Sequence, residues 1–132
     1  MPEQQVAEKK KRLIDEARLP VYNDTRRLYE QVMRSTQKVS VNLKRGAVNE
    51  MEHWLFYALE EITNADMFKD RKQRLDCIRR ASRYIWQVSI RVRALFGLGF
   101  IKETGFSALT NLENLIQKQL AGWAKKTSNE SE

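Results

Sequence analysis

The sequence predicts an all-α protein that folds as an antiparallel up-down-up-down four-helix bundle. Its 132 residues include only five glycines and two prolines, and both prolines lie at or before residue 20, so few residues interrupt helices. Apolar residues recur at spacings of three and four in four segments, which is the period of one helix face. Four amphipathic helices joined by short connections are typical of such a bundle.

The composition bounds the class of protein. The chain has the length of a single domain, and 42% of its residues are apolar while 31% are charged. No apolar run approaches the roughly 20 residues that span a bilayer, and the N-terminus lacks an apolar signal core. The single cysteine, Cys77, excludes an internal disulfide. We therefore expect a cytoplasmic protein with no membrane-spanning segment.

The first helix is predicted over residues 21–39. Residues 1–19 are dense in charge and poor in apolar side chains, so we expect a charged extension that is a frayed helix or disordered. Pro20 suits the first turn of a helix. The stripe that follows consists of Val21, Leu28, Val32 and Val39. Residues 40–46 break the apolar pattern, so we expect a connection there that ends at Gly46.

Three further helices are predicted. The second covers residues 47–67 and has five acidic residues and no Lys or Arg. The third covers residues 71–98, where Gly97 and Gly99 end it. The fourth begins near Ser107 and keeps helical spacing to Trp123. The four-helix domain is thus predicted over residues 20–126, with a disordered polar tail over residues 127–132.

The third helix has two different flanks. Its apolar flank consists of Ile78, Ala81, Ile85, Val88, Val92 and Leu95. At about 100° per residue, the opposite side carries Arg79, Arg80, Arg83 and Arg91. Residues 69–100 hold nine Lys or Arg and two Asp, and seven of the nine are Arg. Arginine favours planar, bidentate contacts with phosphate and carboxylate, so this flank is the candidate binding surface.

The charge balance indicates an anionic partner. The formal net charge is +7, which suits nucleic acid, an acidic protein face or a membrane surface. The first helix adds Arg26, Arg27 and Arg34 to the positive character. The alternative is a solvated charged face with no partner. The predicted nucleic-acid or partner-binding residues are Arg79, Arg80, Arg83, Arg91, Arg26, Arg27 and Arg34.

Three large apolar residues lie outside the predicted core stripes. Trp86 and Ile90 sit about one turn apart on the third helix, and Phe56 lies off the stripe of the second. Apolar side chains on the surface of a small bundle often mark a contact between copies. The sequence therefore predicts a homo-oligomer interface, and the alternative is a wide core flank that absorbs all three.

Catalysis and metal binding are not predicted. His53 follows Glu50 in the Glu-x-x-His spacing of di-iron bundles, but it is the only histidine, and that site needs two copies. Cys77 lies beside the apolar flank of the third helix with no histidine near it in the sequence, which is typical of a buried filler. No Gly-rich phosphate loop follows a strand. We expect a protein that is not an enzyme and holds no cofactor.

Over about Leu19 to Lys126 the chain resembles a known family of small four-helix bundles. The family includes the accessory variability determinant of diversity-generating retroelements and the proteins encoded in 23S rRNA intervening sequences. The resemblance rests on Leu19-Pro20-Val21-Tyr22, the Ala47–Met67 helix ending in Ile62-Thr63-Asn64-Ala65, the Leu75–Leu95 helix with Arg91 and Arg93, and the closing Gly122-Trp123.

The resemblance implies an assembly and a role. It implies a homopentameric barrel of bundles with a positively charged surface. In the retroelement branch, such a protein associates with the reverse transcriptase and with RNA or DNA, and supports mutagenic copying without being a catalyst. The strong basic balance favours that branch. The alternative is the ribosomal-insertion branch, as a structural or interaction protein without nucleic-acid function.

Overall fold

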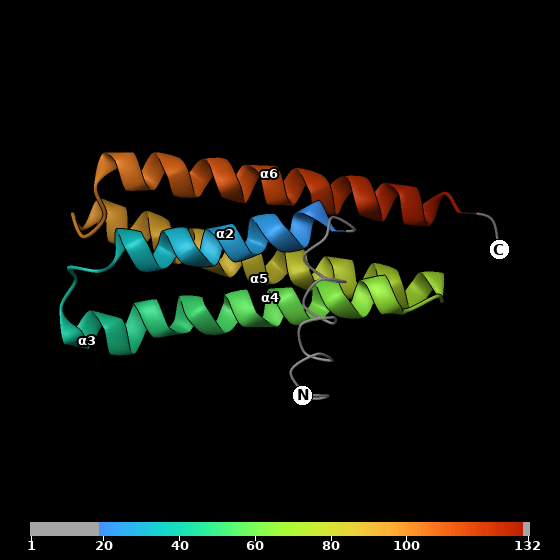
Figure 1. The fold of residues 1–132 in the computed structure, drawn as a ribbon, viewed down its shortest axis with the longest axis horizontal. Helices are drawn as coiled ribbons and strands as arrows, with labels where there is room; N and C mark the ends of the chain where they lie inside the picture. Colours follow the sequence, from blue (N-terminus) through green and yellow to red (C-terminus); the bar gives the residue numbers. More distant parts are fainter. Residues whose placement is uncertain (1–18, 131–132) are drawn as a thin grey trace, which may run out of the picture.

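The computed structural model describes residues 19–130, which form an all-helical structure without strands (Figure 1). The elements are α2 (Pro20–Ser35), α3 (Val41–Leu43), the π-helical turn η1 (Lys44–Val48), α4 (Asn49–Met67), α5 (Arg71–Gly97) and α6 (Glu103–Ser128). The prediction of an all-α protein with four long helices is confirmed. The predictions for residues 1–18 and 131–132 lie outside the described residues.

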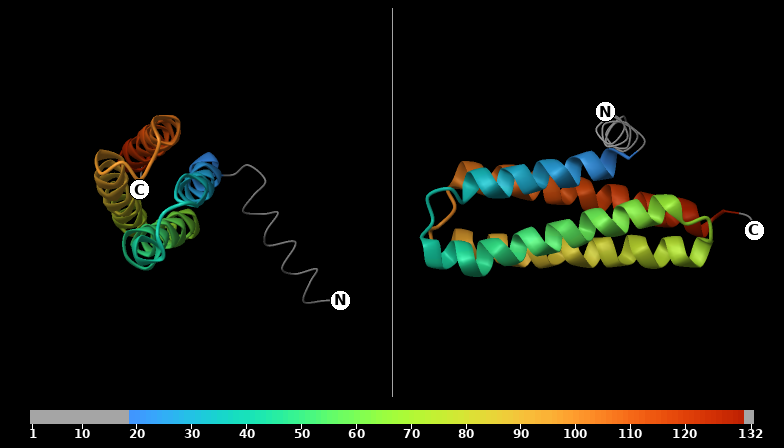
Figure 2. Two further views of the ribbon diagram at one scale, coloured as in Figure 1. Left: turned by 90° about the vertical axis from the view of Figure 1, so that its left-hand side faces the viewer. Right: turned by 60° about the horizontal axis from the view of Figure 1, so that its bottom comes forward.

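The four long helices surround one core in a square arrangement. Extensive packing joins α2 with α4, α4 with α5, α5 with α6, and α6 with α2. The helices α2 and α5 therefore lie diagonally opposite each other, as the end-on view in Figure 2 shows. Glu50 pairs with Arg91, and Glu61 pairs with Arg80. The chain therefore runs in opposite directions along α4 and α5.

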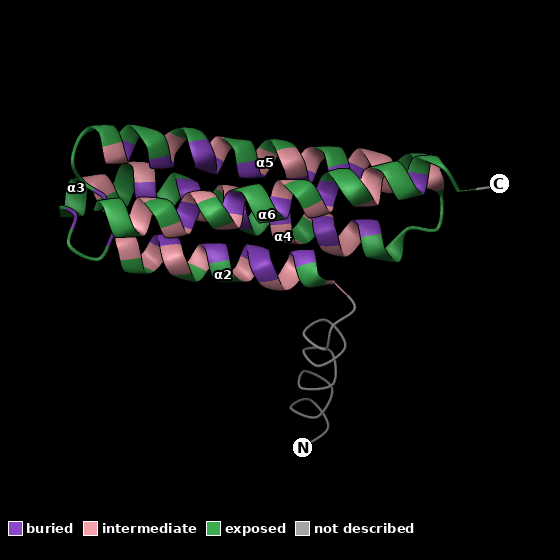
Figure 3. Cartoon of the chain, turned by 90° about the horizontal axis from the view of Figure 1, so that it is seen from above, coloured by how far each residue is buried: buried purple, intermediate pink, exposed green. Residues whose placement is uncertain are grey.

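The predicted apolar stripes form the core. Leu28, Ile62, Ile85 and Ile116, one from each long helix, are completely buried. In Figure 3 the buried residues lie on the inner sides of the helices and the exposed ones on the outer sides. Burying one such side chain stabilises a fold by about 1.5–3 kcal/mol. Helix packing, more than intrinsic helix propensity, therefore holds these elements together.

The first long helix is shorter than predicted. It ends at Ser35, not at residue 39, and the Thr36 hydroxyl donates a hydrogen bond to the Val32 carbonyl oxygen at 2.7 Å. A threonine hydroxyl that bonds to the backbone in this way competes with helix continuation. Val39, the last residue of the predicted stripe, is still buried, but it reaches the core from a turn.

The predicted connection over residues 40–46 is largely helical. Ser40 caps α3, because its hydroxyl oxygen accepts a hydrogen bond from the Leu43 amide at 3.3 Å. The chain then continues through η1 into α4, and Gly46 lies inside η1. Gly46 has no positive φ, and a side chain there would meet nothing within 4 Å, so neither the backbone conformation nor the packing requires glycine at this position. The prediction that Gly46 ends a break was wrong.

The last helix is longer than predicted at both ends. It begins at Glu103, where Phe106 stacks on Phe96 of α5 with ring centroids 4.0 Å apart. It continues to Ser128, and Thr127 is completely buried. The backbone carbonyl oxygen of Glu130 accepts a hydrogen bond from Arg71 at 3.1 Å, and the Glu130 carboxylate lies 3.6 Å from Arg74 at the start of α5. Thr127 and Ser128, which belong to the predicted polar tail, are thus the last two residues of α6.

Gly99 ends the turn that follows α5 and has a φ of +84°. This conformation is costly for residues with a Cβ atom, so Gly99→Ala is expected to lower the free energy of unfolding by about 1 kcal/mol. Gly97→Ala is the matched control, because Gly97 lies within the helix and has no atom within 4 Å of an added Cβ. Urea denaturation followed by circular dichroism measures both, and equal stabilities would contradict the prediction.

Glu113 contributes a carboxyl group to the core. Glu113 on α6 is only 4% exposed, and its Oε1 atom has no hydrogen-bond partner among the described residues. Burial raises the pKa of Glu113 to about 7, while a hydrogen bond with Ser89 and the charge of Arg93 act in the opposite direction. The helical phase places Glu113 on the same face as Leu109 and Ile116, although it was not among the predicted core residues.

Candidate nucleic-acid interface

The three arginines of the first helix do not join those of the third. Arg27 pairs with Asp24 at 3.0 Å, and Arg34 lies 3.7 Å from Glu30. Arg26 is half-buried. All three belong to α2, which lies diagonally across the bundle from α5. The predicted basic face is therefore divided between two separate surfaces.

Two of the four arginines predicted on the outer flank of α5 face α4 instead. Arg80 forms an ion pair with Glu61, and Arg91 pairs with Glu50 at 2.7 Å. The Arg80 guanidinium also lies 3.4 Å from the Cys77 sulfur, and that of Arg91 lies 5.8 Å from the ring centre of Trp54. These two side chains hold α5 against α4, so they are already neutralised within the protein.

The remaining two, Arg79 and Arg83, are exposed on the outer side of α5. Along α5, Arg83 lies four residues after Arg79, Trp86 three residues after Arg83, and Ile90 four residues after Trp86. These spacings place all four on one helix face. Trp86 is 50% exposed and Ile90 is 46% exposed. We call these four residues the outer stripe. One half of the stripe is cationic and the other half is apolar.

The cationic half of the outer stripe is free of ion pairs with the described carboxylates. Neither Arg79 nor Arg83 has a described carboxylate oxygen within 4.0 Å. Both line a shallow depression of about 380 Å³ together with Asp76, Arg80 and Ser82. Because Arg80 is paired with Glu61, two guanidinium groups without a carboxylate partner, those of Arg79 and Arg83, border a single carboxylate, Asp76. This balance leaves the depression positively charged and open to an anion.

Another arginine, outside the outer stripe, lies against its apolar half. The Arg93 guanidinium lies 5.4 Å from the ring centre of Trp86, a distance typical of a cation–π contact. Phe56 is on another side of the bundle, where its ring packs on Tyr29 of α2 with centroids 5.2 Å apart. The three residues of the predicted oligomer interface therefore do not form one patch, because Phe56 is separated from Trp86 and Ile90.

The residues considered for metal binding or nucleophilic chemistry are not assembled into a site. Over residues 19–130, no group of three or more His, Cys, Asp or Glu side chains is placed to hold a metal ion. His53 is exposed, and Cys77 is buried. Burial is also the main reason that the pKa of the Cys77 thiol is raised, which disfavours the reactive thiolate.

None of the described helices combines the length and the apolar character needed to cross a bilayer. Comparison of the sequence with protein-family models and with curated proteins gives no match.

Proposed function

We propose that the protein is a non-enzymatic accessory factor of a diversity-generating retroelement, which binds the reverse transcriptase and nucleic acid to support mutagenic copying. The observation that carries the proposal is the pair of exposed arginines, Arg79 and Arg83, one turn apart and without a described carboxylate partner. Guanidinium groups bind phosphate in a bidentate manner, so they fit a nucleic-acid backbone. The proposed location is the cytoplasm.

The proposed contact is with the phosphate backbone and not with particular bases. The outer stripe lies on a helix that is packed against both α4 and α6, and its cationic half presents guanidinium groups, which suit phosphate oxygens. Phosphate contacts position a protein on nucleic acid but carry no sequence information. The proposed binding is thus electrostatic and independent of sequence.

The apolar half of the outer stripe is the proposed protein contact. Trp86 and Ile90 present large apolar surfaces beside the arginines, a combination enriched at protein interfaces. The proposed assembly is a homo-oligomeric barrel, a pentamer by family resemblance, built from antiparallel up-down-up-down bundles. In such an assembly each copy repeats the cationic half, which raises the affinity for a polyanion through multivalency.

A structural protein without nucleic-acid function is the second candidate. The observation that favours it is the neutralisation of Arg27, Arg34, Arg80 and Arg91 by carboxylates of the same chain. In this case the outer stripe serves self-association alone, with Arg79 and Arg83 meeting acidic residues such as Glu60 of a neighbouring copy.

Fluorescence anisotropy with labelled single-stranded RNA, single-stranded DNA and duplex DNA distinguishes the two candidates. The accessory-factor proposal predicts binding to these ligands at about 50 mM salt and a clear loss of affinity by about 200 mM, because bound phosphates release counterions. The absence of binding to all three ligands at low salt would overturn this proposal and leave the structural role.

The genomic neighbourhood tests the assignment to a retroelement. The proposal predicts an adjacent reverse-transcriptase gene with a template repeat and a variable repeat, and that this enzyme co-purifies with the protein. A location inside a 23S rRNA gene would contradict it.

A further inference from the structure

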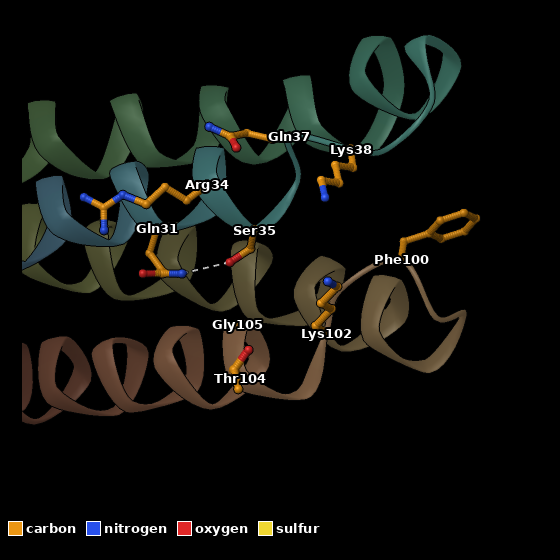
Figure 4. A pocket seen from close by; sticks show the side chains of 9 residues that line it. All are labelled: Gln31, Arg34, Ser35, Gln37, Lys38, Phe100, Lys102, Thr104 and Gly105. Carbon is orange, nitrogen blue, oxygen red and sulfur yellow. Dashed lines mark hydrogen bonds between the residues drawn. The ribbon is translucent and has the colours of Figure 1, made fainter.

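A pocket that the functional proposal does not use lies at one end of the bundle. It is formed between the C-terminal end of α2 and the segment that leads into α6, and its volume is about 380 Å³. This is within the usual range of small-molecule sites, about 300–1,000 Å³. None of the residues that line it is acidic. Figure 4 shows the pocket from close by.

Two lysines converge on this pocket. Lys38 follows α2 and Lys102 precedes α6, and in Figure 4 their side chains extend toward one another. Neither has a described carboxylate oxygen within 4.0 Å. Two ammonium groups that face the same space repel each other unless an anion lies between them. Arg34 also lines the pocket, but it pairs with Glu30 and its guanidinium points away.

Neutral donors complete the surroundings of the lysines. The hydroxyls of Ser35 and Thr104 line the pocket, and Ser35 already accepts a hydrogen bond from Gln31 at 2.9 Å, so its own proton remains to be donated. Lys102 is the N-cap of α6 and gives no side-chain cap, so the first amides of the helix add to the positive potential.

Gly105 is needed for the shape of the pocket. A Cβ atom at this position would lie 2.9 Å from the Ser35 hydroxyl oxygen and 3.3 Å from its Cβ atom. The start of α6 therefore lies too close to the Ser35 side chain of α2 to leave room for a side chain at position 105. This close approach brings the first turn of α6 and Lys102 to the same space as Lys38.

We propose that this pocket binds the phosphate of a nucleotide between Lys38 and Lys102, with the base stacked on Phe100. Phe100 lines the pocket and is 43% exposed, and in Figure 4 its ring extends outward from the lysines, so it offers a stacking surface to a base that projects beyond the phosphate. The phosphate belongs either to a free nucleotide or to the backbone of a single strand. The pocket shares no residue with the outer stripe, so this inference does not rest on the proposed function.

Amide NMR spectra of the full chain, titrated with adenosine 5′-monophosphate, test the site. We expect shifts of the amides of residues 102–105 with a Kd of about 1 mM or tighter, and no such shifts with adenosine. The double variant Lys38→Gln/Lys102→Gln is expected to bind at least about tenfold more weakly, which corresponds to roughly 1.4 kcal/mol. Lys69→Gln/Lys118→Gln is the control, because both of these lysines are exposed and lie outside the pocket.

A five-residue oligothymidylate identifies the source of the phosphate. Tighter binding than the mononucleotide at the same amides identifies a single strand, whereas shifts with the mononucleotide alone identify a free nucleotide. Phe100→Leu is expected to weaken both but not inorganic phosphate. Unchanged affinity in the double lysine variant, or no shifts at residues 102–105 with either ligand, would overturn the site. Charge reversal at Arg79 and Arg83 should leave these shifts intact, which separates this test from that of the proposed function.

Discussion

Replacing Glu113 by glutamine is expected to raise the free energy of unfolding by about 2 kcal/mol at pH 8 and by little at pH 5. Burial holds the pKa of Glu113 at about 7 in the folded protein, above its ordinary value. Ionising a carboxyl with such a raised pKa costs roughly 3 kcal/mol of folding free energy. Glutamine has a similar shape and no charge, but its buried amide offsets about 1 kcal/mol of the gain.

The sign of the pH dependence follows from proton binding. Between about pH 4.5 and pH 7 the folded protein keeps the Glu113 proton, whereas the unfolded chain has lost it. Unfolding therefore releases a proton in this range, and the Glu113 contribution to stability falls as pH rises. Above about pH 7 both states are ionised and the contribution becomes constant. The variant lacks this contribution, so its advantage grows from pH 5 to pH 8.

Urea denaturation followed by circular dichroism at several values between pH 5 and pH 8 measures this effect. Glu60→Gln is the matched control, because Glu60 is an exposed glutamate on α4. The control is expected to change stability by less than about 0.5 kcal/mol at every pH. A stability difference between wild type and Glu113→Gln that is the same at pH 5 and pH 8 would contradict the buried, protonated carboxyl.

Charge reversal at the outer stripe is expected to weaken nucleic-acid binding at least about tenfold at low salt. The change Arg79→Glu/Arg83→Glu removes two proposed phosphate contacts and places carboxylates where the backbone would lie. Both side chains are exposed and make no ion pair with a described carboxylate, so helical content should not change. Arg80 is left in place because Arg80→Glu would set two carboxylates, its own and that of Glu61, against each other.

The control for this variant must change the net charge equally. Lys69→Glu/Lys118→Glu removes two positive and adds two negative charges, so both double variants lower the formal charge from +7 to +3. Lys69 and Lys118 are exposed but lie outside the outer stripe. Fluorescence anisotropy is expected to give near wild-type affinity for the control. Equal losses in the two variants would show that overall charge, and not the outer stripe, governs binding.

The helical architecture could be predicted from periodicity because the core residues repeat along each helix. Leu28 and Ile85 belong to the predicted stripes of the first and third helices, and both are completely buried. Helix ends were predicted less well, since Thr36 and Ser40 act through single hydrogen bonds that no periodic pattern contains. Thr127 was assigned to a polar tail by composition, although it packs in the core.

The candidate site could be predicted only in part. Helical phase separates inner from outer residues, and it correctly placed Arg79 and Arg83 on the outside of α5, whereas for Trp86 and Ile90 it left open whether a wide core flank buries them. It does not reveal which residue of a neighbouring helix a side chain between the two flanks contacts. The prediction therefore put Arg80 and Arg91 on the binding surface, whereas α4 pairs them with Glu61 and Glu50. The diagonal placement of α2 and α5, and the convergence of Lys38 and Lys102, depend on how the helices assemble.

The salt dependence of nucleic-acid affinity tests the central claim most directly, because it measures how many phosphates the protein neutralises. The measurement compares wild type with Arg79→Gln/Arg83→Gln on one single-stranded ligand between about 50 and 200 mM salt. If the two arginines contact phosphates, the slope of log affinity against log salt becomes shallower by about 1.4 in the variant, roughly 0.7 for each lost contact. An identical slope for the two proteins would show that Arg79 and Arg83 do not bind the backbone.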